Sequence, residues 1–152
     1  MTRLLGIDLG AVRIGLALGD APHGPVRPLA TIRRGATVPD DVGALREIVD
    51  REGVAEVVLG LPLDFDGTEG HQALLTREWG TAIEEALGLP VVLRDERLTS
   101  DLAARRVGPM KRGRSGGPPT STQRRAYRAR LDREAAAIIL RDELDARSGS
   151  ET

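Results

Sequence analysis

Residues 54–61 restrict the fold of this 152-residue chain more than any other segment. The segment is short, rich in β-branched side chains and almost continuously apolar, which is typical of a strand covered on both faces. Gly60 and Pro62 mark its end. Because helices on either side of a sheet provide such a cover, the segment predicts an α/β fold with helices on both faces of the sheet.

The remaining apolar patterns complete a five-stranded mixed sheet. Residues 10–13 open with a glycine and predict a β-hairpin between the first two strands. Thr37 and Pro39 are typical of the start of a helix. The expected order is βββαβαβαα. Four further strands are predicted at residues 4–9, 14–18, 28–33 and 90–94, and helices at residues 38–52, 75–86, from residue 99, and at 123–147.

Length and composition predict one domain, residues 1–147, followed by a flexible tail, residues 148–152. Glycine and proline in residues 113–119 predict a mobile connection. The chain contains no cysteine, which excludes disulfides and thiolate metal sites and favours a reduced setting. No apolar stretch approaches the roughly 18 residues of a membrane span. We therefore expect a cytoplasmic protein that does not bind membranes.

Three acidic residues occupy positions where this pattern favours apolar side chains. Asp8 lies within the first strand, Glu96 follows the fifth, and Asp132 shares the apolar stripe of the last helix with Ala136 and Ile139. A buried carboxylate is costly unless a cation compensates its charge. Strand ends converge at one edge of a sheet, so we expect these three acids to hold Mg²⁺ or Mn²⁺. Two such ions could support phosphodiester cleavage; three ordinary surface acids are the alternative.

Charge is distributed unevenly along the chain. The formal net charge is −1, yet residues 103–131 contain nine basic residues and no acid. Such a block is typical of contact with phosphates, although a solvated loop in an arginine-rich chain is the alternative. Together with the neighbours of Asp8 and Glu96, this block gives the candidate nucleic-acid contacts Arg13, Arg97, Thr99, Arg105, Arg106, Lys111, Arg112, Arg114, Arg124, Arg125 and Arg128.

Four motifs, in this order, resemble the YqgF family, also called RuvX, small bacterial proteins of the RNase H-like fold. The resemblance extends from the N-terminus to about residue 144. It implies an RNase H-like nuclease whose catalytic and metal-binding acids are Asp8, Glu96 and Asp132. The motifs are residues 6–10 with 13–17, residues 58–63 with 66–70, residues 89–91 with 95–99, and Leu131-Asp132 before residues 135–140.

What the resemblance implies about the substrate is maturation of the 5′ end of pre-16S ribosomal RNA. By fold analogy with RuvC, resolution of four-way (Holliday) DNA junctions is the nearest alternative. A monomer would favour RNA processing, whereas a homodimer would favour a resolvase that makes paired cuts. A non-catalytic RNA-binding module is a further alternative. A phosphate-binding ATPase or sugar kinase would need two lobes, and this chain offers one such motif.

Some residues depart from the family pattern. Ala11 and Val12 stand where the family usually has Thr and Lys, which leaves Arg13 as the cation nearest to Asp8 in the sequence. Asp64 replaces a usual Asn and adds a negative charge. The basic segment, residues 107–130, is also longer than we expect for the family.

Overall fold

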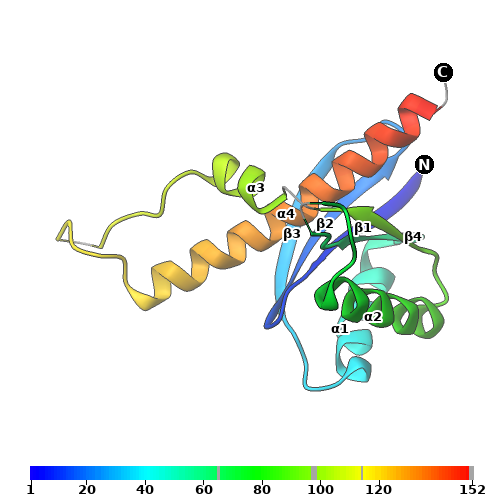
Figure 1. Ribbon diagram of the computed structural model, residues 1–152, viewed down its shortest axis with the longest axis horizontal. Coiled ribbons are helices and arrows are strands. Elements are labelled where there is room, and N and C mark those ends of the chain that lie inside the picture. Colours follow the sequence, from blue (N-terminus) through cyan, green and yellow to red (C-terminus); the bar gives the residue numbers. More distant parts are fainter. Residues whose placement is uncertain (65, 97–98, 114, 151–152) are drawn as a thin grey trace.

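The computed structural model describes residues 1–64, 66–96, 99–113 and 115–150. A five-stranded sheet runs through it in the order β3-β2-β1-β4-β5 (Figure 1). β2 is antiparallel to β1 and β3, whereas β4 and β5 are parallel to β1. The sheet is therefore mixed, as predicted. Its strands are β1 (Thr2–Leu9), β2 (Arg13–Ala21), β3 (Val26–Arg33), β4 (Glu56–Leu61) and β5 (Val91–Asp95).

The predicted hairpin joins β1 to β2, and its turn is closed by the Gly10 amide, which donates to the carbonyl of Arg13 at 2.9 Å. β2 and β3 are longer than predicted because they continue to pair beyond their apolar residues, as far as Gly19 and Val26. Backbone pairing thus extends both strands past the residues whose apolar pattern indicates them.

Within the described ranges, four helices connect and cover the strands in the predicted order. Thr37 caps α1: its hydroxyl accepts from the Asp40 amide, while the Asp40 carboxylate accepts from the Thr37 amide. α4 continues to Ser150, beyond the predicted end at Arg147, whose side chain pairs with Glu56 and Glu143. Of the expected flexible tail, residues 148–152, residues 148–150 are helical and residues 151–152 lie outside the described residues. The helices are α1 (Val38–Glu52), α2 (His71–Leu87), α3 (Thr99–Val107) and α4 (Ser121–Ser150).

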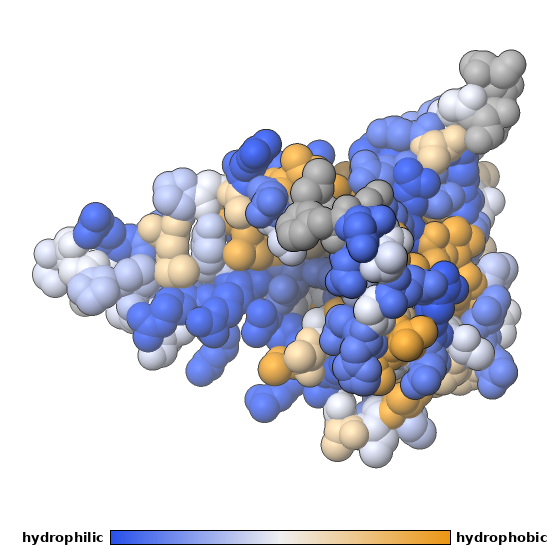
Figure 2. All heavy atoms as spheres, viewed as in Figure 1, coloured by the Kyte–Doolittle hydropathy of each residue, from blue (hydrophilic) through white to orange (hydrophobic). Residues whose placement is uncertain are grey.

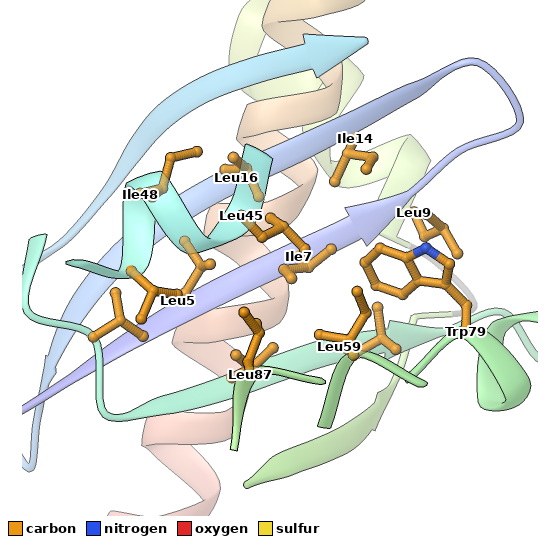
Figure 3. Packing of buried hydrophobic residues seen from close by; sticks show 14 of the residues in the cluster. Leu5, Ile7, Leu9, Ile14, Leu16, Leu45, Ile48, Leu59, Trp79 and Leu87 are labelled. Atoms are coloured by element: carbon orange, nitrogen blue, oxygen red, sulfur yellow. The ribbon is translucent and has the colours of Figure 1, made fainter. Parts of the chain in front are cut away.

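Each face of the sheet has its own apolar core. Leu5, Ile7 and Leu9 of β1 pack under α1 and α2, together with the buried Trp79 (Figure 3). Leu4 of β1 packs on the opposite face against α4. This alternation follows from the extended backbone and confirms the prediction of helices on both faces.

α3 packs against α4, and the first half of α4 extends with the preceding segment beyond the sheet as an arm (Figure 1). We define the arm as α3, residues 108–120 and the first three turns of α4. It carries the basic block noted in the sequence. In the part of the chain that the structure describes, no helix is long and apolar enough to cross a membrane.

Candidate metal centre and nucleic-acid groove

Asp8 lies near the end of β1, on the face of the sheet that α4 covers. Its neighbours Ile7 and Leu9 belong to the opposite core. Because successive side chains alternate between faces, the Asp8 carboxylate is directed toward α4. Its cross-strand partner is Gly15 of β2, which has no side chain to cover the carboxylate.

Glu96 follows β5 directly, at the edge of the sheet where β1 also ends. β1, β4 and β5 are parallel, so their carboxyl ends lie side by side. The Glu96 amide donates to the carbonyl of Leu61 at 3.2 Å, which continues the pairing past the strand. Gly60 leaves room for the side chain, since a Cβ there would lie 2.7 Å from Oε2 of Glu96. The structure thus brings Asp8 and Glu96 together as a hydrogen-bonded pair.

Burial disfavours the state in which both carboxyl groups of this pair are ionised. Burial, opposed by the hydrogen bond from Glu96 and assisted by the charge of Asp132, raises the pKa of Asp8 to about 6. Burial and the charge of Asp8 raise the pKa of Glu96 to about 9. At neutral pH the pair therefore holds one proton, which lies in the hydrogen bond between the two carboxyl groups.

Asp132 lies on α4, above the strand pair that contains Asp8. A Cβ on Gly15 would lie 2.0 Å from the carbonyl oxygen of Asp132, so only glycine lets the helix backbone come this close to β2. The Asp132 carboxylate accepts a hydrogen bond from Nε of Arg13, at 2.5 Å. Arg13 is thus the ion-pair partner of Asp132.

The three acids do not form one cluster in this structure. The described ranges contain no group of three or more acidic or histidine side chains placed to hold a metal ion. Asp8 and Glu96 share a proton, and Asp132 lies near enough for its charge to affect Asp8, but it points to Arg13. Two of the three expected ligands are therefore together, and the third is paired with a cation.

A basic groove of about 530 Å³ opens beside Arg13, between β2, β3 and the start of α4. Two residues of its lining join the walls: the Thr31 hydroxyl of β3 donates a hydrogen bond to the carbonyl of Ala129 of α4. No acid lines the groove among the described residues. Its lining consists of Val12, Arg13, Thr31, Ile32, Arg33, Ser121, Arg124, Arg125, Arg128 and Ala129.

The other expected contacts lie mostly on the arm. Thr99, the first residue of α3, is buried, and its amide donates to the Glu96 carbonyl at 3.1 Å. Arg106 forms an ion pair with Glu134 at 3.4 Å. Arg97 and Arg114 lie outside the described residues. On the arm, but not among the residues that line the groove, are Arg105, Arg106, Lys111 and Arg112.

Comparison with known proteins identifies the family. The family model "RuvX: Holliday junction resolvase" matches residues 2–146. The chain belongs to the RuvX family. A relative from Anaeromyxobacter sp. (strain K), named "Putative pre-16S rRNA nuclease", is 43% identical and aligns over 96% of this chain and 98% of its own length. A relative of the same name from Moorella thermoacetica is 37% identical over 94% of each chain.

Solved structures agree on the fold of this RuvX chain. RuvC of Thermus thermophilus, in complex with a Holliday junction substrate, matches with a TM-score of 0.57 and 15% identity. The match covers 98% of this chain and 97% of RuvC. At this identity the likeness concerns the fold, and it confirms the expected RNase H-like α/β architecture.

Sequence reasoning missed three residues that shape the site of this RuvX chain. Gly15 and Gly60 make room for α4 and for Glu96, but a glycine inside a strand does not reveal which neighbour comes close. Arg33 lines the groove although it lies outside the basic block. Its register opposite Arg13 across β2 and β3 is the signal that could have suggested it.

Proposed function

We propose that this chain is a metal-dependent nuclease that hydrolyses phosphodiester bonds in structured nucleic acid, with the 5′ end of pre-16S ribosomal RNA as its substrate. The observation that carries the proposal is a half-buried, hydrogen-bonded Asp8–Glu96 pair together with a groove lined by five arginines, one of which, Arg13, binds the third acid, Asp132. The names of the relatives supply pre-16S rRNA as the substrate, and the family resemblance supplies its 5′ end. With this substrate, the proposed activity would take place in the cytoplasm.

The chemistry of the donors fits Mg²⁺ or Mn²⁺. Hard divalent ions take oxygen ligands, and carboxylates are their usual protein ligands. Burial and like charge raise the pKa values of Asp8 and Glu96. A bound cation would compensate the negative charge of the pair, as the shared proton does in its absence. Asp8, Glu96 and Asp132 would hold the metal, which when bound supplies Lewis-acid catalysis and lowers the pKa of water.

The residues of the chain would bind and orient the substrate around these carboxylates. The groove arginines would hold the phosphate backbone, which sets the register of the strand without reading its sequence. Asp8 and Glu96 must release their shared proton before both can act as anionic ligands. We therefore expect activity to increase with pH as that proton is lost.

A second candidate function is the resolution of four-way DNA junctions. The description of the matching family model favours it. The same acids and the same groove would serve both functions, since phosphate contacts do not distinguish the two backbones. The two functions are therefore distinguished by testing which substrate the protein cuts, RNA or a DNA junction.

The direct test is parallel cleavage of an end-labelled pre-16S-like RNA stem and a four-way DNA junction, in Mg²⁺ and in Mn²⁺. Asp8→Asn keeps the size of the side chain and removes the charge. Asp50→Asn, at an exposed position on α1, is the matched control. We expect wild type and the control to cut the RNA, and Asp8→Asn to lose at least about a hundredfold in rate.

Selective cutting of the junction would instead favour the second candidate. Cleavage by Asp8→Asn at the wild-type rate would contradict the assignment of Asp8. Binding of both substrates without cutting in either metal would favour the non-catalytic RNA-binding module.

A further inference from the structure

Arg13 lies between two parts of the site. Its guanidinium donates to Asp132 on one side and lines the basic groove on the other. Its backbone is held in place, because the carbonyl of Arg13 accepts from the Gly10 amide and its strand pairs with β3. Only the side chain is therefore free to change partners.

This ion pair keeps Asp132 away from the other two acids. The described residues contain no three-acid cluster, although Asp132 is near enough to act electrostatically on Asp8. The backbone of α4 at Asp132 already lies against Gly15, which is the cross-strand partner of Asp8. Asp132 is kept from acting as the third metal ligand by its pairing with Arg13.

We propose that Arg13 couples nucleic-acid binding to completion of the metal site. A phosphate that enters the groove takes the guanidinium from Asp132, and the released carboxylate joins Asp8 and Glu96 as a ligand. The inference rests on the proposed function, since it uses the same acids and the same groove. Arg13 acts as a positioning residue, because it determines where Asp132 points.

The exchange is physically easy. The side chains of Arg13 and Asp132 are 33% and 21% exposed, so water and a phosphate can reach both groups and screen their attraction. A phosphate offers the guanidinium the same two-oxygen recognition as a carboxylate. The other groove arginines, Arg33, Arg124, Arg125 and Arg128, hold the phosphate backbone nearby. The released Asp132 gains a metal in place of the arginine.

Linkage makes the coupling reciprocal, so it is measurable without catalysis. We would measure Mn²⁺ binding from the paramagnetic resonance signal of the free ion, with no nucleic acid present. Arg13→Met keeps the length of the side chain and removes its donors. Arg128→Met is the matched control, because Arg128 lines the same groove and, among the described contacts, does not pair with Asp132.

The proposal predicts that Arg13→Met binds Mn²⁺ about tenfold more tightly than wild type, the gain from one released ligand. Arg128→Met removes the same charge and should change the affinity by no more than about twofold. Adding Asp132→Asn to Arg13→Met should cancel the gain. Circular dichroism of each variant checks that the helices are intact.

Nucleic acid provides the second arm of the test. A phosphorothioate RNA stem, which resists cutting, should tighten Mn²⁺ binding by wild type about tenfold and leave Arg13→Met unaffected. Conversely, Asp132→Asn releases Arg13 and should bind the stem more tightly than wild type in EDTA. This reciprocal variant keeps the proposal testable should Arg13→Met fold poorly.

The outcomes separate this proposal from the proposed function. Equal Mn²⁺ affinities for Arg13→Met and Arg128→Met, with Asp8-dependent cleavage intact, would overturn the coupling and leave the nuclease in place. Failure of wild type to bind Mn²⁺, with or without the stem, would overturn both.

Discussion

At the residue scale, the Asp8–Glu96 pair makes stability depend on pH. Burial raises the pKa of Asp8 to about 6 and that of Glu96 to about 9, whereas unfolded carboxyl groups titrate near pH 4. Between about pH 4 and about pH 9, the folded state therefore binds more protons than the unfolded state. The free energy of unfolding therefore decreases as the pH rises from about 4 to about 9.

Glu96→Gln should remove the upper part of this pH dependence. In metal-free buffer, we expect wild type to lose up to about 1.4 kcal/mol of unfolding free energy per pH unit between pH 6 and pH 9, since one proton is released. The variant should be nearly flat over that range and more stable than wild type at pH 8. Urea unfolding at a series of pH values measures both slopes.

The exposed Glu47→Gln variant on α1 is the control and should keep the wild-type slope. A Glu96→Gln slope equal to that of wild type would show that Glu96 does not hold the proton.

Gly15 sets the distance between α4 and the sheet. Because a Cβ there would lie 2.0 Å from the carbonyl oxygen of Asp132, Gly15→Ala should push α4 away and destabilise the protein by about 1–3 kcal/mol. Gly43→Ala is the matched control, because nothing lies within 4 Å of the added Cβ. On α1 that change should be neutral or stabilising, by up to about 1 kcal/mol.

Thermal unfolding compares the two alanine variants directly. Equal stabilities would contradict the close contact between β2 and Asp132. We also expect Gly15→Ala to cleave nucleic acid more slowly than Gly43→Ala, because the displaced helix carries Asp132 with it.

The sequence indicated the acids because a charge within an apolar pattern stands out at the level of single residues. Asp8 and Glu96 do lie together, and their convergence follows from parallel strands sharing an edge. The partner of Asp132 was not predictable in this way. Arg13 lies 119 positions away, and its side-chain direction depends on the packing of α4 across β2, which no local pattern encodes.

At the element scale, α4 has two halves with different surroundings. The half from Leu131 onward was predictable from its apolar stripe, because it packs on the sheet. The first half projects beyond the sheet as part of the arm (Figure 1) and has basic residues on its surface. Its start was predicted two residues late, since an exposed helix lacks the apolar repeat that marks a boundary.

The groove side of this first half should dominate binding to nucleic acid. We expect Arg125→Glu/Arg128→Glu to weaken binding of an RNA stem and to reduce the slope of log K against log salt by roughly 2, about 0.9 for each lost phosphate contact. Fluorescence anisotropy at several salt concentrations measures the slope. Both residues line the groove.

Arg51→Glu/Arg77→Glu makes the same change of charge on α1 and α2 and is the control. It should leave the slope almost unchanged. Equal slopes for the two double variants would show that the binding energy comes from overall charge and not from the groove.

At the scale of the whole molecule, charge is separated in space as well as in sequence. The arm carries the basic block, and Figure 2 shows hydrophilic residues gathered along it. The body contains nearly all of the acids, so the net charge of −1 conceals the separation. The chain order of the elements and the two covered faces of the sheet were predictable from apolar periodicity, whereas the projection of the arm depends on how far α4 extends past the sheet.

Each chain has one Asp8–Glu96 pair and one groove beside Arg13, and this limits what one molecule can cut. A single centre suffices for one cut in an RNA stem, whereas symmetric cuts in a four-way junction need two centres related by a two-fold axis. The proposed RNA function therefore predicts one chain per RNA stem in sedimentation velocity, with cleavage rates proportional to protein concentration. Two chains per junction, together with paired nicks in opposite strands, would instead identify the junction as the substrate for which this site is built.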